Sequence, residues 1–470
     1  MIPSRCAILG TLLVAVLMSP TEAGEHLAVY PPLTPVFKQW VEQVFEYNRS
    51  SLGDVFRKSH PQRKPSETLT EKCLDLFAES LSGRNEVPAS VVEVAALAAY
   101  DVGTEDPMVF YSLGMYAQGR DDIVSAVRWF ERSWTAIAGT AYPPHRKMMI
   151  AKRLATCYRL QEGAAWSPRS TQMCEAAVRH AVEMLHDRDF ANPAKKNLFA
   201  LWLGQDTYND RSGVQLRQRD ALVKEFANGG IDPWLQQVVL GNIEINKAWE
   251  ARGGGWANTI TDESWKGFAQ HLEAAERALT KAWEIDPTMV IAPTMMLVVC
   301  MGKSYDLERH FLWFNRALVA QMDCEILYDN LFQAVQPRWG GDHRLILAVG
   351  SDALATGHFT TNIPRFYIRA LSAVIADIES MKGDVSPVLA DAAIWEKVSA
   401  TYLGYLAEPA NAAMQNWYRT CYAGMAWRFH QPDVCRSQLD LLRDNVDPVL
   451  FKNCARADVA DVRTKISSPP

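Results

Sequence analysis

The sequence predicts an all-α protein made of antiparallel helix hairpins that stack as a solenoid or as a compact helical-repeat array. Apolar residues recur along most of the 470 residues at the three-to-four-residue spacing of amphipathic helices. Strand-like alternation between Asn-Gly or Asp-Gly turns is absent from the sequence. Residues 271–287 (HLEAAERALTKAWEIDP) are the clearest example, because Ala275 and Ala282 sit on one helical face with Leu279 between them.

The first 23 residues have the pattern of a secretory signal. Arg5 precedes a short apolar run that ends at Met18, and small residues at Thr21 and Ala23 suit a cleavage site. The run is too short for an ordinary membrane span, although an uncleaved N-terminal anchor stays an alternative. We therefore expect an exported protein, periplasmic or secreted, with no integral membrane span once the signal is removed.

Residues 24–105 are expected to form an N-terminal helical cap. A first helix is predicted over 34–48, where Phe37, Val41 and Val44 form an apolar stripe. A polar stretch at 57–70 interrupts the pattern, and two further helices are expected at roughly 70–82 and 87–102.

Residues 106–227 are expected to hold the first repeats, and 106–138 the first full one. Phe110 and Leu113-Gly114 lie on its first helix, and Ala126 and Phe130 on its second. Gly114 and Ala126 would let the two helices approach closely while the larger side chains fill the space around them. A second pair is predicted at 145–160 and 171–186.

Residues 228–384 are expected to form the core helical repeats, and 385–470 the C-terminal hairpins. An insertion over 251–268 (ARGGGWANTITDESWKGF) separates the first core helix from its partner. The remaining predicted helices are 234–250, 271–284, 288–301, 306–321, 325–335, 342–355, 389–405, 411–429, 433–444 and 448–460.

The spacing in 106–138 and 271–287 resembles the tetratricopeptide repeat, with Leu279 where that pattern has Phe. In addition, RGGGWA at 252–257, KAWEIDP at 281–287 and PRWGG at 337–341 resemble a bacterial family of unknown function with a helical-repeat fold. The resemblance covers roughly 228–430. It implies the fold and export, and it carries no activity or catalytic residue.

Composition limits the classes of partner. The formal net charge of −6 provides no basic field, so we do not expect nucleic acid as a partner. Nucleophile-elbow, P-loop, HExxH and dinucleotide-binding motifs are missing, and we therefore predict no enzymatic activity and no cofactor. His180, Glu183 and His186 share one helical face, but a second Glu-x-x-His is missing and a solvated polar face is favoured over a metal site.

Eight cysteines follow the predicted signal, and an even number in an oxidising compartment permits disulfides. Cys157 and Cys174 are about equally far from a turn near residue 167, and Cys435 and Cys454 from a turn near residue 445. Antiparallel helices would bring each pair together. Free buried thiols are an equal alternative.

The predicted binding site lies on the loops between paired helices, which share one edge of a stack of hairpins. Glycines let backbone amides approach a ligand, and Arg beside Trp suits anions or planar groups. The alternative is a purely structural role for these residues. In that case Gly-Gly ends the helices, the Trp packs into a neighbouring repeat and the Arg caps carbonyl groups. The candidate residues are Arg252, Gly254, Trp256, Lys303, Arg338, Trp339, Asp342 and His343.

The favoured function is that of an exported protein–protein interaction module whose partner is another protein. Two alternatives are a small-ligand-binding protein or enzyme that uses the Gly/Trp/Arg edge, and a neutralising partner of an exported toxin. All three rest on the analogy with other helical-repeat folds.

Overall fold

The computed structural model describes residues 28–61, 64–84, 87–163, 167–204 and 214–467, and it confirms the predicted all-α fold. Helices packed in successive pairs make up almost all of these residues, and no strand occurs among them. The predicted signal over 1–23 lies outside the described residues. Contacts divide the described residues into two units, one within 32–330 and one within 331–470 together with the described part of 1–31.

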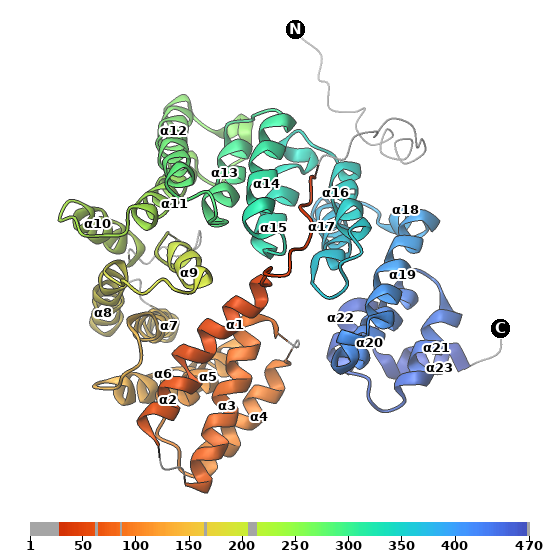
Figure 1. Cartoon of the computed structure of the whole chain (residues 1–470), viewed down its shortest axis with the longest axis horizontal. Coiled ribbons are helices and arrows are strands. Elements are labelled where there is room, and N and C mark those ends of the chain that lie inside the picture. Colours follow the sequence, from red (N-terminus) through yellow and green to blue (C-terminus); the bar gives the residue numbers. More distant parts are fainter. Residues whose placement is uncertain (1–27, 62–63, 85–86, 164–166, 205–213, 468–470) are drawn as a thin grey trace. The chain divides into compact units, whose positions relative to one another are not determined.

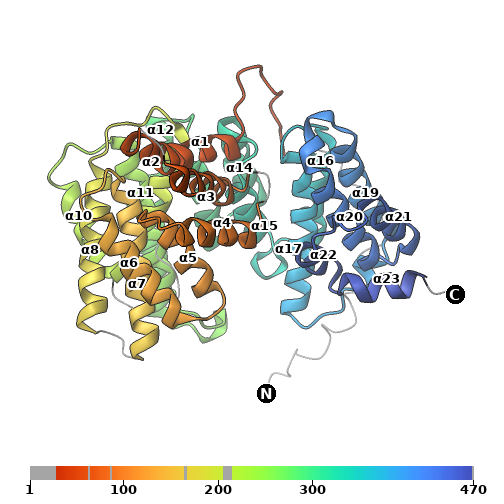
Figure 2. The same ribbon diagram turned by 90° about the horizontal axis from the view of Figure 1, so that it is seen from below.

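The larger unit, 32–330, is a succession of paired helices (Figure 1; Figure 2 shows α5 to α8 side by side). Its helices are α1 (Trp40–Ser51), α2 (Gly53–Ser59), α3 (Pro65–Ser82), α4 (Ala89–Asp101), α5 (Pro107–Gly119), α6 (Ile123–Ile137), α7 (Pro144–Glu162), α8 (Pro168–Leu185), α9 (Pro193–Gly204), α10 (Val214–Phe226), α11 (Pro233–Arg252), α12 (Asp262–Ile285), α13 (Ile291–Gly302), α14 (Leu307–Gln321) and the first part of α15 (Glu325–Ala334).

The predicted close approach of paired helices is confirmed in two hairpins of this unit. A Cβ placed on Gly114 of α5 would lie 2.6 Å from the ring of Phe130 on α6. A Cβ on Gly241 of α11 would lie 2.6 Å from Leu279 of α12. Phe130 and Leu279 are fully buried. The glycines therefore determine how near the helices of each pair lie.

Helix α1 joins the two ends of the larger unit. The backbone N–H of Trp40 donates to Asp323 Oδ2 at 2.7 Å, in the turn between α14 and α15. On its way, α1 packs against α3 and α9 (Figure 1). The start of the unit is thereby held against its end, 283 residues later.

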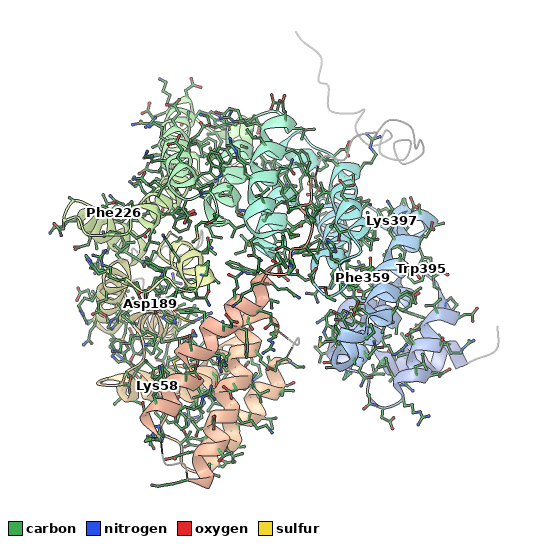
Figure 3. The ribbon with its side chains drawn as sticks, viewed as in Figure 1. Lys58, Asp189, Phe226, Phe359, Trp395 and Lys397 are labelled. Atoms are coloured by element: carbon green, nitrogen blue, oxygen red, sulfur yellow. The ribbon has the colours of Figure 1, made fainter. Side chains whose placement is uncertain are left out.

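The smaller unit contains the rest of α15, then α16 (His343–Ala355), α17 (Phe366–Ser380), α18 (Ser386–Leu389), α19 (Ala392–Ala407), α20 (Gln415–Arg428), α21 (Pro432–Leu442), α22 (Pro448–Ala455) and α23 (Val459–Ser467). Aromatic rings fill the space between its helices: Phe359 meets Tyr405 edge-on at 5.2 Å, and Trp395 stacks on Tyr422 at 5.9 Å (Figure 3).

Several element boundaries differ from those expected. Helix α12 begins at Asp262, where Thr261 caps it by accepting from the Ser264 N–H, so the loop between α11 and α12 is shorter than the predicted insertion. Helix α1 begins at Trp40 rather than at residue 34. Helices α2, α9, α10, α17, α18 and α23 were not predicted. Helix α16 packs mainly against α17 instead of pairing with 325–335.

In the part of the chain that the structure covers, no helix combines the length and the apolar character that crossing a membrane requires.

Candidate functional site

The first predicted loop, between α11 and α12, is held in shape by Arg252. Its Nη1 donates to the carbonyl oxygens of Gly253 at 3.1 Å and Gly255 at 3.2 Å. The guanidinium lies over the rings of Trp249 and Trp265, at 5.7 and 5.3 Å. Arg252 is thus used to fix the loop, as the predicted capping alternative requires.

Trp256 is an exposed large apolar residue of this loop. Its carbonyl accepts from the N–H of Thr259 at 2.8 Å and from the hydroxyl at 2.7 Å, while its side chain is 72% exposed. A Cβ on Gly255 would lie 2.5 Å from the Thr259 hydroxyl, so glycine is needed there, and Gly254 is exposed beside it. The indole of Trp256 is therefore exposed on a constrained backbone and does not pack into a neighbouring repeat.

The second predicted loop, between α13 and α14, places Lys303 in an ion pair. Lys303 Nζ lies 2.7 Å from Glu276 Oε2, and the Tyr305 hydroxyl and Arg309 also donate to this carboxylate. Burial acts to raise the pKa of Glu276, but the hydrogen bonds from Lys303 and Tyr305 outweigh it and lower that pKa. The charge of Lys303 is therefore balanced within the unit.

The third predicted loop lies in the smaller unit, between α15 and α16. Arg338 Nη2 and His343 Nε2 lie 3.0 and 2.9 Å from the two carboxylate oxygens of Asp377, which is 6% exposed. Asp342 caps α16 by accepting from the Leu345 N–H at 2.9 Å, and Trp339 is half-buried.

The backbone conformation explains why the PRWGG segment has two glycines. Gly340 has φ +92°, and a Cβ on Gly341 would lie 2.0 Å from the carbonyl oxygen of Val335. Only glycine allows this close approach of backbone to backbone.

The three cations of the predicted edge are thus all engaged within their own units. The loops of Arg252 and Lys303 belong to the larger unit and the loop of Arg338 to the smaller one, so a composite pocket stays a prediction. Each guanidinium or ammonium already contacts a carboxylate or carbonyl oxygen. This arrangement makes these loops less suited to binding an anion.

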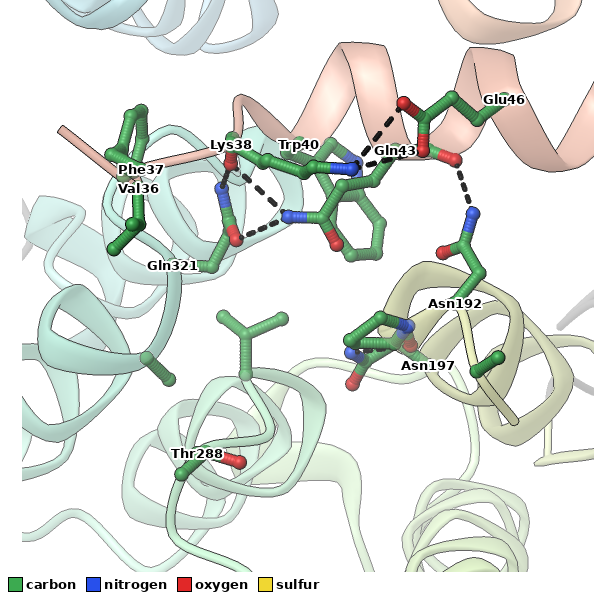
Figure 4. Close-up of a pocket in the computed structure, with 14 residues that line it drawn as sticks. Val36, Phe37, Lys38, Trp40, Gln43, Glu46, Asn192, Asn197, Thr288 and Gln321 are labelled. Atoms are coloured by element: carbon green, nitrogen blue, oxygen red, sulfur yellow. Dashed lines mark hydrogen bonds and ion pairs between the residues drawn. The ribbon is translucent and has the colours of Figure 1, made fainter.

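The sequence did not predict a cavity of about 540 Å³ in the larger unit, where α1 meets α9, α13 and α14 (Figure 4). We call it the carboxamide cavity because four of its lining residues are Asn or Gln. It is lined by Val36, Phe37, Lys38, Trp40, Gln43, Glu46, Ala191, Asn192, Pro193, Asn197, Thr288, Val290, Ala320 and Gln321.

Two glutamines hold one wall of the carboxamide cavity. Gln43 Nε2 donates to Gln321 Oε1 and to the Lys38 carbonyl, both at 3.1 Å, and Gln321 Nε2 donates to the same carbonyl at 3.0 Å (Figure 4). Asn192 Nδ2 donates to the Gln43 carbonyl at 2.9 Å. These bonds order the side chains and leave each carboxamide oxygen with further capacity to accept.

The wall depends on the contact that anchors α1. Asp323, which accepts from the Trp40 N–H, also accepts from the Gln321 side chain. Burial raises the pKa of Asp323 to about 6, although these hydrogen bonds act to lower it. No local sequence signal could have revealed this cavity, because Gln43 and Gln321 are 278 residues apart.

The remaining lining of the carboxamide cavity is apolar or paired. Lys38 and Glu46 form an ion pair at 3.5 Å, with side chains 65% and 49% exposed. Phe37, Trp40 and Val290 contribute apolar surface. The cavity therefore combines carboxamide oxygens that can still accept with apolar walls, and it suits an uncharged ligand that has hydrogen-bond donors.

A second cavity of about 650 Å³ lies in the same unit, at the ends of α2, α5 and α6. Its buried carboxylate, Asp106, accepts from Met108 and Val109 N–H groups at the start of α5 and from the Tyr142 hydroxyl at 2.7 Å. Burial raises the pKa of Asp106. Because this carboxylate is committed to capping α5, the cavity is a weaker candidate.

The predicted Glu-x-x-His helix separates into two pairs. His180 Nδ1 lies 2.7 Å from Glu183, whereas His186 Nε2 lies 2.9 Å from Glu225 of α10. Within the described ranges, no group of three His, Cys, Asp or Glu side chains is placed to hold a metal ion.

The cysteines after the predicted signal are free thiols in this structure. Cys157 on α7 and Cys174 on α8 are buried in neighbouring helices, and Cys435 lies on α21 and Cys454 on α22. The predicted disulfide pairing of these cysteines stays a prediction.

Comparison of the chain with protein-family models, with curated proteins and with solved structures finds no match. The function must therefore be argued from the site.

Proposed function

We propose that the protein is an exported protein–protein interaction module that receives an uncharged, extended segment of a partner polypeptide in the carboxamide cavity. The observation that carries this proposal is the lining itself, in which ordered Asn and Gln side chains stand beside Phe37, Trp40 and Val290. Export rests on the pattern of the first 23 residues.

Peptide backbone matches this lining in chemistry. Each residue of an extended peptide offers one N–H donor, and the carboxamide oxygens of Gln43 and Gln321 retain capacity to accept from it. Apolar side chains of the same segment would be removed from water against the apolar walls. The cavity volume of about 540 Å³ lies within the usual range for ligand sites and accommodates a few residues of such a segment.

Charged ligands fit this cavity less well. Among the described residues that line it, the ionic groups are Lys38 and Glu46, which neutralise one another at the rim. A carboxylate or phosphate would have to displace Glu46 from Lys38 and would still lie beside that carboxylate. The proposed segment is therefore neutral, and a toxin neutralised by this protein is one kind of partner that could supply it.

A photo-crosslinking amino acid in place of the exposed Thr288 tests the proposal in the native cell envelope. We expect one crosslinked complex of defined stoichiometry. Ala191→Trp, at an exposed lining position, fills the cavity and should abolish the crosslink. Ala227→Trp adds the same side chain at an exposed turn after α10, away from the cavity lining, and should retain it.

Two results would contradict the proposal. One is a crosslinked complex that survives Ala191→Trp while circular dichroism shows the variant to be folded. The other is the lack of any complex together with a metabolite that raises the melting temperature of the wild type and not of Ala191→Trp. The second result would establish a small-ligand-binding protein instead.

The Trp256 loop is a second candidate for partner contact, favoured by its 72% exposed indole on a constrained backbone. Large aromatic anchors supply much of the binding energy in protein interfaces. Trp256→Ala should weaken the crosslinked complex at least tenfold if this loop contacts the same partner. An unchanged affinity would restrict the interface to the cavity.

A further inference from the structure

Helices α20 and α22 of the smaller unit pack against one another (Figures 1 and 2). A Cβ on Gly424 of α20 would lie 2.6 Å from the Cβ of Cys454 on α22 and 3.1 Å from the carbonyl oxygen of Phe451. Cys421 precedes Gly424 by three residues and therefore lies on the same face of α20. The sulfur of Cys454 shares a hydrogen bond with the thiol of Cys421.

The environment of this pair differs from that of the other cysteines. The hydrogen bond from Cys421 lowers the pKa of Cys454, burial opposes it, and the nearby positive charges of Arg428 and Arg456 lower the pKa further. Burial instead raises the pKa of Cys73, Cys157, Cys300, Cys324 and Cys435. Cys454 is also half-buried, whereas Cys421 is 2% exposed, so Cys454 is the sulfur that a reagent reaches first.

We propose that Cys421 and Cys454 form a redox-active dithiol that closes to a disulfide and fastens α22 to α20. The predicted partner of Cys454 was Cys435, but the hydrogen bond and the close approach at Gly424 point to Cys421.

The oxidant is a small-molecule disulfide, and the reaction is a double exchange. The Cys454 thiolate attacks one sulfur of the disulfide and expels a thiolate, which takes up the proton that Cys454 has lost. Cys421 then attacks the Cys454 sulfur of the mixed disulfide and expels the second thiolate, which takes up the proton of Cys421. Two protein thiols are oxidised to one disulfide by two electrons, and the small disulfide is reduced to two thiols.

The test uses the full mature chain and oxidised glutathione as the probe. We expect the loss of two of the eight thiols in a colorimetric assay, and a Cys421–Cys454 linkage in the peptide map of the non-reduced protein. Cys435→Ser is the matched control and should form the same linkage. Cys421→Ser should stop at a stable mixed disulfide with glutathione on Cys454.

Brief alkylation of the wild type with iodoacetamide gives a readout that does not depend on any variant folding. Cys454 should be modified at least tenfold faster than Cys435, and prior oxidation should protect it. A Cys435–Cys454 linkage, glutathione retained on Cys454 in the wild type, or equal alkylation of Cys435 and Cys454 would each overturn the proposal.

Discussion

The two units of this protein differ in how far along the chain their polar contacts reach. In the larger unit, the buried Arg146 donates to Asn48 Oδ1 at 2.7 Å, across 98 residues, and the Trp40 N–H reaches Asp323 across 283. In the smaller unit, the Tyr405 hydroxyl donates to the Thr361 carbonyl across only 44 residues.

This difference indicates that the units depend on different parts of the sequence. Adding length to a loop costs little closure entropy, so a distant bond can be stable, but it forms only when both ends are present and docked. The larger unit therefore relies on α1 as a closing element. The smaller unit relies on contacts between helices that are close in sequence, as repeat arrays usually do.

The largest expected effect is at Arg146, whose guanidinium is fully buried and donates to Asn48 and to the Ser51 hydroxyl at 2.8 Å. Arg146→Ala removes two charge-assisted hydrogen bonds and leaves a cavity, which should cost about 3–5 kcal/mol. Because a chain with two units need not unfold in one step, hydrogen exchange of α1 and α7 amides is the appropriate measurement.

Gln161→Ala, at an exposed position of the same helix, is the control and should change protection by about 0.5 kcal/mol or less. A gain in stability for Arg146→Ala would mean that the cost of burying the guanidinium exceeds the worth of its bonds. In that case α1 would not be the closing element that the comparison requires.

The second largest effect is expected at close helix contacts, which should be equally important for the stability of both units. Gly114→Ala would drive a methyl group into Phe130, and Gly424→Ala would drive one into Cys454, each at 2.6 Å. Both should cost about 1–3 kcal/mol by overpacking. If only the variant in the smaller unit lost protection in hydrogen exchange, close helix packing at Gly114 would not stabilise the larger unit.

Gly119→Ala provides the control for both variants. It lies in α5, and nothing is found within 4 Å of a Cβ at this position. Alanine there should stabilise the larger unit by about 0.4–1 kcal/mol, since it restricts the unfolded chain.

The same contrast explains what the sequence could predict. The hairpin of α5 and α6 was predicted because Gly114, Ala126 and Phe130 are near one another in sequence and their spacing has a direct packing consequence. The contact between Gln43 and Gln321 leaves no such local pattern. The fold class is a sum of local signals, whereas the carboxamide cavity is made by long-range closure.

The predicted edge shows a different limit of the sequence. Arg252 and Trp256 suggested a ligand site because Arg beside Trp suits anions, but the same chemistry lets Arg252 bind carbonyl groups of its own loop. Residue type indicates what a side chain can bind. Only the backbone path shows whether the protein itself already supplies that partner.

A pH dependence confined to the larger unit should come from His145. Its ring lies within hydrogen-bonding distance of the Tyr47 hydroxyl, at 2.8 Å, and burial, with the charges of Arg146 and Lys195, holds its pKa well below 6.5. Below pH 6.5 the unfolded chain binds a proton that the folded unit does not. Stability should therefore fall as the pH falls, by up to about 1.4 kcal/mol per pH unit.

The His145→Gln variant isolates this effect. The pKa of Asp323, raised to about 6 by burial, gives the opposite dependence, because its stabilising contribution is lost as the pH rises from about 4 to 6. The measurement is therefore the protection of α7 amides at pH 5 and at pH 7.5, and its change between the two pH values is compared between the wild type and His145→Gln. Equal slopes would show that His145 gains its proton in the folded unit.

The smallest effect should be at Lys397, whose ammonium donates to the Ser351 hydroxyl at 2.8 Å and joins α19 to α16 in the smaller unit (Figure 3). This bond resembles the one from Arg146 in kind, but it is exposed to water, which competes for both groups. Lys397→Ala should therefore change α19 protection by less than about 0.5 kcal/mol. If Lys397→Ala lost as much protection as Arg146→Ala, burial would not explain the difference in strength between the two bonds. The smaller unit would then also depend on polar contacts between helices that are not neighbours in sequence.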